Sequence, residues 1–320
     1  MNNRRDFIKK AGALSIALPL MGAGIGCKSE SKNVIPDVKE TVTEAVNSGF
    51  TLDEFGIQLW SVRDFMEKDP KGTLKTLGEY GYNTIESFQG SDGVFWGMKP
   101  KEYASYLSDH NLKTVSAHCD SQYALDPKKR DEFKKLVDDA SEIGMQYLVN
   151  PYMAFLKTQD DFKNATDGMN ELGVLCEKNG IQYCYHNHAY SFVSIDGVKP
   201  QNLMMDGTAG GPVGFEMDIY WTTAGGADPL AYLDAYPNRY HLMHLKDMKE
   251  KVTFSGDGGT PNQWMELFPY MTTAGDGVLD IPAIIAKAKK ASVKHFYVEQ
   301  DMVANPHTAL QKSIDYLKMV

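Results

Sequence analysis

The chain has 320 residues, of which 42% are hydrophobic and 23% are charged, and its formal net charge is −9. These proportions are ordinary for a globular protein and exclude a disordered chain, a collagen and a coiled coil. The acidic balance argues against a nucleic-acid partner, because neutralising phosphates supplies most of the affinity for DNA and RNA.

The first 27 residues have the pattern of a bacterial export signal. Arg4-Arg5 is followed, after one residue, by Phe, Ile and Lys at 7–9, which resembles the twin-arginine signal. The apolar run at 11–25 is too short and too rich in Gly and Ala for a membrane span. It ends at Cys27, in a context that resembles a lipoprotein cleavage site. We therefore expect twin-arginine export to the periplasmic side and membrane attachment by a lipid on Cys27. A plain signal peptide is the alternative.

Residues 28–50 are polar and show no apolar face, which predicts a flexible tether. The folded domain is expected to span 51–320. Its cysteines, Cys119, Cys176 and Cys184, are odd in number and cannot all pair internally. We expect them to be buried free thiols.

From residue 55 onward, short β-rich runs alternate with longer amphipathic stretches. Strands are predicted at 55–59, 84–86, 114–118, 147–150, 182–185, 214–218, 241–244 and 296–299. Helices are predicted at 71–80, 100–110, 127–143, 159–179, 228–236 and 281–291. Gly81, Gly144 and Gly180 follow three of these helices as stop signals. Eight such units in about 250 residues predict a single-domain (β/α)8 TIM barrel with parallel strands. An open doubly wound sheet is the alternative, but no glycine-rich phosphate turn follows the first strand.

Polar residues occupy the C-terminal ends of the predicted strands, where a TIM barrel carries its chemistry. Residues two apart on a strand share a face, so His186 points with His188, Glu216 with Asp218, and His244 with Lys246. Imidazole and carboxylate together suit Mn²⁺, Zn²⁺, Fe²⁺ or Co²⁺. The strand-end candidates are Glu86, His118, His186, His188, Glu216, Asp218, His244, Lys246 and Glu299.

Four of these segments resemble the xylose-isomerase-like barrel superfamily and, within it, proteins labelled sugar phosphate isomerases/epimerases. They are Tyr185-His186-Asn187-His188, Gly214-Phe215-Glu216-Met217-Asp218 with Tyr220-Trp221, His244-Leu245-Lys246-Asp247, and Tyr297-Val298-Glu299-Gln300-Asp301. The resemblance covers about 55–305.

Members of that superfamily hold one divalent metal with Glu, Asp, His and Glu at strand ends. Carried over by motif, the resemblance implies Asp218, His244 and Glu299 as ligands, with His186 in the position of the first Glu. One divalent ion, Mn, Zn, Co or Mg, is therefore expected. Family epimerases exchange protons through two glutamates on opposite faces of the substrate, so His186 argues against simple two-base epimerisation.

These residues and the resemblance predict a metal-dependent sugar isomerase or epimerase that removes a proton next to a carbonyl. Glu299 is expected to be both ligand and base. Lys246 is expected to stabilise oxyanion charge, and His188 to bind a hydroxyl or shuttle a proton. Further substrate-binding candidates are Glu86, His118 and Glu216, with Trp60 and Trp221 as walls for a sugar ring or as ordinary packing residues.

An export signal, and a sequence without a clear phosphate-cradling loop, favour an unphosphorylated sugar or keto-sugar. The alternatives are a metal-dependent lyase or hydratase on a keto-sugar, and a sugar-binding lipoprotein without catalysis. A DNA-repair endonuclease shares the superfamily but needs a basic DNA face, which the charge of −9 opposes. The oligomeric state stays open, with a homo-oligomer as one option.

Overall fold

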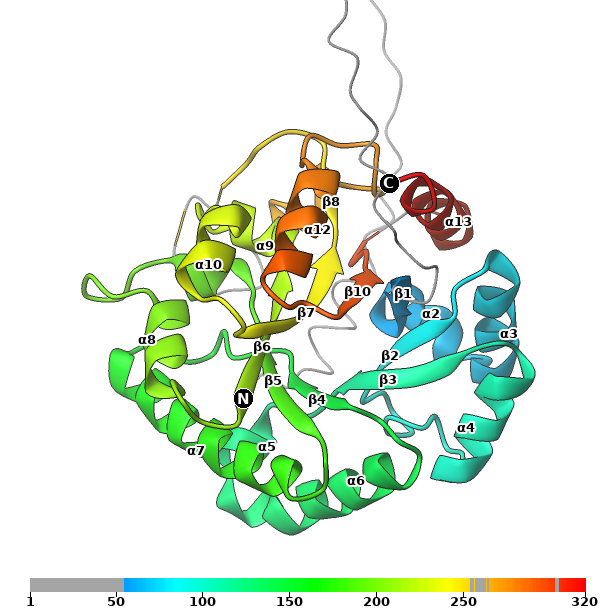
Figure 1. Cartoon of the computed structure of the whole chain (residues 1–320), viewed down its shortest axis with the longest axis horizontal. Helices are drawn as coiled ribbons and strands as arrows, with labels where there is room; N and C mark the ends of the chain where they lie inside the picture. The colour runs from blue at the N-terminus through cyan, green and yellow to red at the C-terminus, as the bar shows by residue number, and fades with distance from the viewer. Residues whose placement is uncertain (1–54, 254–255, 257–262, 264, 303–304) are drawn as a thin grey trace, which may run out of the picture. The chain divides into compact units, whose positions relative to one another are not determined.

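The computed structural model describes residues 55–253, 256, 263, 265–302 and 305–320. Within them, eight parallel strands close into a barrel in the order β1-β10-β7-β6-β5-β4-β3-β2, and helices cover its outside (Figure 1). The strands are β1 (Phe55–Gln58), β2 (Thr84–Phe88), β3 (Lys113–His118), β4 (Tyr147–Asn150), β5 (Gln182–His186), β6 (Val213–Asp218), β7 (Tyr240–Leu245) and β10 (His295–Val298). The predicted TIM barrel is confirmed. The predicted signal at 1–27 and tether at 28–50 lie outside the described residues.

The predicted helices are all present. They are α3 (Pro70–Tyr80), α4 (Pro100–Asp109), α6 (Arg130–Glu142), α7 (Gln159–Glu177), α10 (Pro229–Ala235) and α12 (Ile281–Lys290). The sequence prediction missed α8 (Pro200–Gly207) before β6, and α13 (Pro306–Leu317) after the last strand. Both begin with proline at the first helical position, where its fixed φ suits a helix start. The described chain also has shorter helical elements: α2 (Arg63–Met66), α5 (Gln122–Leu125), α9 (Ile219–Ala224), η2 (Leu59–Val62), η3 (Pro127–Lys129), η4 (Ala189–Phe192) and η5 (Phe268–Tyr270).

Local signals explain where these helices begin and end. α7 starts with a capping box, in which the Thr158 side chain accepts from the backbone N–H of Asp161 and the Asp161 side chain accepts from that of Thr158. Gly81, Gly144 and Gly180 take positive φ values of 93°, 74° and 73°, as expected for glycine just beyond a helix. The three stop signals are therefore confirmed.

An apolar layer lies directly below the polar strand ends. Cys184, Leu242 and Tyr297 belong to one buried cluster. Each precedes a polar strand-end residue by two positions and therefore shares its face. These side chains close the barrel beneath the site and exclude water from below. Cys119, Cys176 and Cys184 are buried free thiols, as expected.

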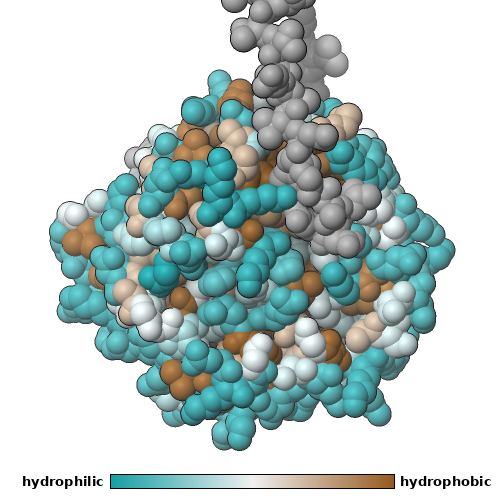
Figure 2. Space-filling model, viewed as in Figure 1, coloured by the Kyte–Doolittle hydropathy of each residue, from teal (hydrophilic) through white to brown (hydrophobic). Residues whose placement is uncertain are grey.

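The surface of the barrel is mainly hydrophilic on the face drawn in Figure 2, and hydrophobic residues there form small separate patches. In the part of the chain that the structure describes, no helix has the length and apolar character needed to cross a membrane.

A short antiparallel pair follows β7, formed by β8 (Asp247–Met248) and β9 (Met271–Thr272). Asp247 is buried and anchors the chain that follows β9. Its Oδ1 accepts from the backbone N–H groups of Met248 at 2.8 Å and Leu279 at 3.2 Å, and its Oδ2 accepts from those of Gly275 and Gly277, both at 3.0 Å. One carboxylate therefore satisfies four backbone donors.

Replacing Asp247 with Ala is expected to lower the free energy of unfolding by about 2–4 kcal/mol, because one buried and three partly buried backbone donors lose their acceptor. Urea denaturation followed by circular dichroism measures this loss. Asp228→Ala is the matched control, since the Asp228 side chain accepts from one backbone N–H, that of Leu230, at an exposed helix start. An equal effect of the two substitutions would contradict the anchoring role of Asp247.

Candidate metal centre

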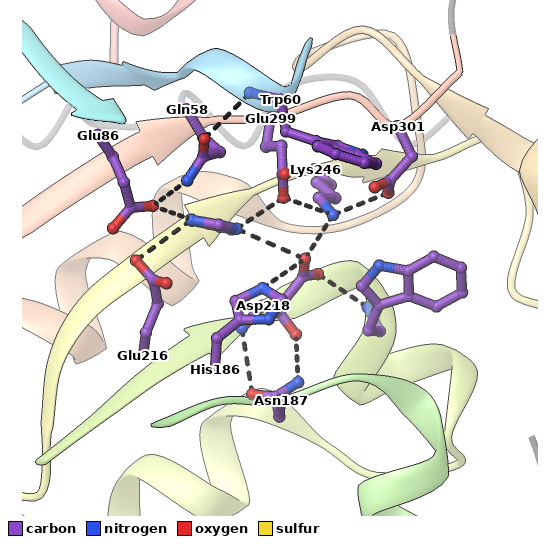
Figure 3. A network of polar contacts seen from close by, with 12 residues as sticks. Gln58, Trp60, Glu86, His186, Asn187, Glu216, Asp218, Lys246, Glu299 and Asp301 are labelled. Atoms are coloured by element: carbon purple, nitrogen blue, oxygen red, sulfur yellow. Dashed lines mark hydrogen bonds and ion pairs between the residues drawn. The ribbon is translucent and has the colours of Figure 1, made fainter. Parts of the chain in front are cut away.

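Strand register brings the polar side chains together inside the barrel. In the β-ladders, His186 lies opposite Glu216, and Asp218 lies opposite His244. Glu299 follows β10 directly. Because side chains alternate between the two faces of a strand, these residues meet at the C-terminal end of the barrel (Figure 3).

Two groups of possible metal ligands are present among the described residues. The outer group is His186, Asp218, His244 and Glu299, and the inner group is Glu86, His118, Glu216 and His244. In each group, one ligand atom from every residue lies within 4.8 Å of the others. His244 is common to both, with Nδ1 facing the outer group and Nε2 facing the inner group.

The spacing in the outer group suits a divalent ion. Nε2 of His186 lies 3.4 Å from Oδ2 of Asp218, and Nδ1 of His244 lies 3.9 Å from that oxygen. Nδ1 of His244 also lies 2.7 Å from Oε2 of Glu299. Ligand atoms about 2.0–2.2 Å from a tetrahedral ion lie roughly 3.3–3.6 Å from one another, so small adjustments would seat a metal here.

The same outer-group atoms lack hydrogen bonds. Among the described residues, the buried atoms without a hydrogen-bond partner include both ring nitrogens of His186, Nδ1 of His244, Oδ2 of Asp218 and Oε2 of Glu299. Buried polar atoms nearly always have such partners. A cation between these four side chains would satisfy them together, so the residues fit a divalent metal.

Asp218 is held in place by its neighbours in sequence and in the barrel. It caps the N-terminus of α9, where its Oδ1 accepts from the backbone N–H of Trp221 at 2.9 Å. Asn187 clamps its backbone, since the Asn187 carbonyl accepts from the Asp218 N–H at 3.2 Å and the Asn187 amide donates to the Asp218 carbonyl at 3.3 Å. Oδ2 of Asp218 is therefore left to face the outer group.

The inner group is hydrogen-bonded internally. Glu86 accepts from Gln58 at 2.9 Å and from Ser116, and its Oε2 lies 2.6 Å from Nε2 of His244. Nε2 of His118 lies 2.8 Å from Oε2 of Glu216. A carboxylate on one imidazole nitrogen directs the other nitrogen toward a metal. The inner group is thus best understood as the support that aims Nδ1 of His244 outward.

Burial and charge set the protonation of the inner group. Burial alone would lower the pKa of His118, but Glu86 and Glu216 raise it to about 9. Burial would likewise raise the pKa of Glu86, but His118 and His244 lower it well below its usual range. The pKa of His244 is raised well above the ordinary value, because Glu216, Glu299 and Glu86 outweigh the effect of burial.

This charge pattern predicts a pH dependence of stability in the metal-free protein. A histidine whose pKa is raised in the folded state stabilises the fold fully at pH values below its pKa in the unfolded chain, about 6.5. This stabilisation is lost as the pH rises through its pKa in the folded protein. His118→Gln should therefore lower the free energy of unfolding most near pH 6, and progressively less toward pH 9.5. Urea denaturation in chelator at pH 6, 7.5 and 9.5 measures the difference. A difference that stays constant over this range would contradict the charged state of His118.

The carboxylates of the outer group lie beside the positive charge of Lys246. Burial would lower the pKa of Lys246, but Asp218, Asp301 and Glu299 raise it well above its usual value. Burial would raise the pKa of Glu299, but Lys246 and His244 lower it well below its usual value. Glu299 is therefore an ionised carboxylate and Lys246 an ammonium.

The two neighbouring histidines of the fifth strand end are neutral. Burial lowers the pKa of His186, and it lowers the pKa of His188 well below the ordinary value. Neutral imidazole is the form that ligates a metal. The ring of His188 lies 4.8 Å from that of His186, and 5.7 Å from that of Trp221. His188 is thus placed beside the outer group without belonging to it.

The remaining candidates divide between the two groups. Glu86, His118 and Glu216 lie in the inner group, with less than a tenth of each side chain exposed, and their substrate-binding role stays a prediction. Trp221 is buried, and Trp60 is half-buried with the Arg63 guanidinium 4.9 Å from its ring centre. The role of Trp60 and Trp221 as walls for a sugar ring stays a prediction.

Sequence reasoning missed Gln58 and Asp301. Gln58 donates to Glu86, and Asp301 accepts from Lys246. Gln58 ends β1, and Asp301 lies three residues after β10. The strand-end rule used for the other candidates would have found Gln58, and the two-residue spacing from Glu299 would have found Asp301.

Comparison with known proteins is consistent with this geometry. A sequence profile of the family described as xylose isomerase-like TIM barrel matches residues 74–320. An inosose dehydratase from Geobacillus kaustophilus strain HTA426 is 24% identical over 290 residues, which are 87% of this chain and 85% of that protein. A crystal structure of a sugar phosphate isomerase/epimerase from Parabacteroides distasonis has a TM-score of 0.68 and 25% identity, over 87% of this chain and 98% of that one. A structure of a protein named IolI with a bound zinc atom has a TM-score of 0.65 and 15% identity, over 83% and 98%.

Proposed function

Because the chain belongs to the xylose isomerase-like TIM barrel family, we propose that it is a metal-dependent enzyme that removes a proton next to the carbonyl of a sugar or sugar-derived ketone. The observation that carries the proposal is the convergence of four buried ligand residues, among them the ionised carboxylate of Glu299, beside the ammonium of Lys246. The metal ligands in this proposal are His186, Asp218, His244 and Glu299. The zinc in the IolI structure makes zinc one reasonable choice, with Mn, Co and Mg as the others.

When bound, a divalent ion would act as a Lewis acid on the carbonyl and acidify the neighbouring C–H. Glu299 is ionised and buried, and is the carboxylate available to take up the proton. Lys246 offers an ammonium N–H to oxyanion charge that develops as the proton leaves. His188, neutral and next to His186, can donate or accept a proton at a substrate hydroxyl.

Two measurements on the purified full chain test this proposal. Elemental analysis should find one divalent ion per chain. A panel of keto-sugars incubated with the protein in deuterated water should include one that gains deuterium next to its carbonyl, as seen by mass spectrometry or NMR. Metal-free protein and an absence of exchange into every keto-sugar would overturn the proposal and favour a non-catalytic sugar-binding protein.

Isomerisation or epimerisation is the first candidate outcome, and dehydration is the second. Dehydration is favoured by His186, which stands where the family has a second glutamate, because elimination needs only one carboxylate base. The similarity to an inosose dehydratase over 87% of the chain points the same way. Deuterium gain without loss of water identifies an isomerase or epimerase. Release of water with growth of ultraviolet absorption from an unsaturated ketone identifies a dehydratase.

The expected export of the protein bears on the substrate and on its place in the cell. Phosphorylated sugars are mainly cytoplasmic, so we propose an unphosphorylated sugar or keto-sugar as substrate. We also propose twin-arginine export and a lipid anchor on Cys27, on the evidence of the N-terminal sequence.

Replacing Cys27 with Ser is expected to move the protein from the membrane fraction to the periplasmic fraction, because the acylated residue is lost. Fractionation followed by immunoblotting measures the distribution. Cys119→Ser is the control, since that thiol is buried in the barrel and should leave the distribution unchanged. A Cys27→Ser variant that stays on the membrane would show that lipidation there is not the anchor.

A further inference from the structure

The ammonium of Lys246 occupies the side of the outer group that faces Asp301. Among the described residues, its Nζ lies 2.8 Å from Oδ2 of Asp218, 2.7 Å from Oε2 of Glu299 and 2.8 Å from Oδ2 of Asp301 (Figure 3). The Lys246 side chain is fully buried. Asp218 and Glu299 are proposed ligands, so the ammonium contacts the same two oxygens that a metal would use.

These three contacts are not equivalent. The contact from Nζ to Asp301 has hydrogen-bond geometry. Oδ2 of Asp218 and Oε2 of Glu299 have no hydrogen-bond partner in the described structure, although the ammonium lies close to both. Lys246 therefore donates to Asp301 with hydrogen-bond geometry and forms close ion pairs with the two ligand oxygens.

Asp301 is well placed to retain the ammonium. It lies two residues after Glu299, outside both groups of possible ligands. Its side chain is 12% exposed, whereas those of Lys246 and Asp218 are fully buried. An ammonium held by Asp301 alone would stay in the site without covering the ligand oxygens.

We propose that Lys246 and a divalent metal compete for the oxygens of Asp218 and Glu299, and that Asp301 is the positioning residue that holds Lys246 when the metal binds. The inference rests on the proposed metal centre. The ammonium balances the ligand carboxylates before the metal binds, and its hydrogen bond to Asp301 is kept afterwards. Loss of Asp301 would remove the one carboxylate outside the ligand set that contacts Lys246 in the described structure, leaving the ligand oxygens and the Trp221 ring, 5.6 Å from Nζ, and this would favour the ammonium over the metal.

A double-mutant cycle in Mn²⁺ affinity tests this competition. The full-chain protein, stripped with chelator, is titrated with Mn²⁺ while the signal of the free aqua ion is followed by electron paramagnetic resonance. Lys246→Met removes the competitor and should tighten Mn²⁺ binding. Asp301→Asn should weaken binding about ten- to a hundredfold, the range for one hydrogen bond between charged groups. In the Lys246→Met background, Asp301→Asn should change the affinity by less than about threefold.

The cycle separates the proposal from simple charge effects. If Asp301 acts only through its negative charge, Asp301→Asn will weaken Mn²⁺ binding equally in both backgrounds, and the proposal is overturned. An Mn²⁺ affinity unchanged by Lys246→Met would also overturn it. Failure of both the wild type and Lys246→Met to bind Mn²⁺, Zn²⁺ or Co²⁺ would instead refute the metal centre itself.

Two further variants guard against trivial outcomes. Lys246→Gln repeats the test should the Met variant fold poorly, as judged by circular dichroism. Lys129→Met is the matched control, because Lys129 pairs at 2.8 Å with Asp120, a carboxylate that belongs to neither group of ligands. It should leave the Mn²⁺ affinity unchanged, and an effect equal to that of Lys246→Met would contradict the specific competition.

Discussion

Replacing Glu299 with Gln is expected to slow proton exchange between a bound keto-sugar and solvent by about 10²–10⁴-fold, the usual contribution of a general base. The amide keeps the shape of the carboxylate and can still offer an oxygen to a metal, but it cannot take up the proton. Some metal affinity should therefore survive. Deuterium incorporation at saturating substrate and metal measures the rate.

Asp218→Asn is the matched comparison for this experiment. Asp218 is a proposed ligand whose Oδ1 already caps α9, and Asn can keep that capping bond through its own oxygen. Metal affinity and exchange rate should fall in parallel in this variant, whereas Glu299→Gln should separate them. If Glu299→Gln binds metal and exchanges protons at the wild-type rate, the base lies elsewhere, and His188, whose imidazole is neutral, becomes the next candidate.

Replacing Glu86 with Ala is expected to lower the free energy of unfolding by about 3–5 kcal/mol, because removing one partner leaves buried charges uncompensated. Glu86 is fully buried and contacts His118 at 3.3 Å and His244 at 2.6 Å. Both imidazoles lose an acceptor at once, and Gln58 loses the carboxylate to which it donates. Urea denaturation of the metal-free protein measures the loss.

The matched control for Glu86→Ala is Glu102→Ala on the surface. Glu102 pairs with Lys71 at 3.2 Å, but 55% of its side chain is exposed, so solvent screens the pair. Its removal should change stability little. The two variants should also differ in Mn²⁺ affinity, because Glu86 aims Nδ1 of His244 at the outer group. A Glu86→Ala protein as stable as Glu102→Ala, with unchanged Mn²⁺ affinity, would remove the supporting role of the inner group.

Much of the fold follows from local patterns that a sequence displays directly. The eight strands were predictable because helices and strands differ in the spacing of their apolar residues. The helix ends before Gly81, Gly144 and Gly180 were predictable because the residue just beyond a helix often takes a positive φ, which glycine adopts easily. α8 was missed because it is short, with eight residues that end in Gly207. A proline at position 200 was the available signal.

Side chains alternate between the two faces of a strand, so the sequence predicts which site residues of one strand point the same way. Knowing that residues two apart share a face is enough to pair Glu216 with Asp218 and His244 with Lys246. The outer group of ligands was therefore within reach of sequence and family resemblance. Its convergence is a geometric finding, while metal binding by these residues stays a prediction.

What only the tertiary structure decided is which atoms of distant strands meet. Nε2 of His244 faces Glu86, 158 residues away in sequence, so that its Nδ1 faces Glu299. The Lys246 ammonium donates a hydrogen bond to Asp301, which is 55 residues away in sequence. The sequence alone did not indicate this partner. Barrel closure and strand register set these contacts, and both depend on packing the whole sheet on itself. Local sequence patterns carry no information about that register, which is why the orientation of His244 and the partner of Lys246 emerged only from the folded barrel.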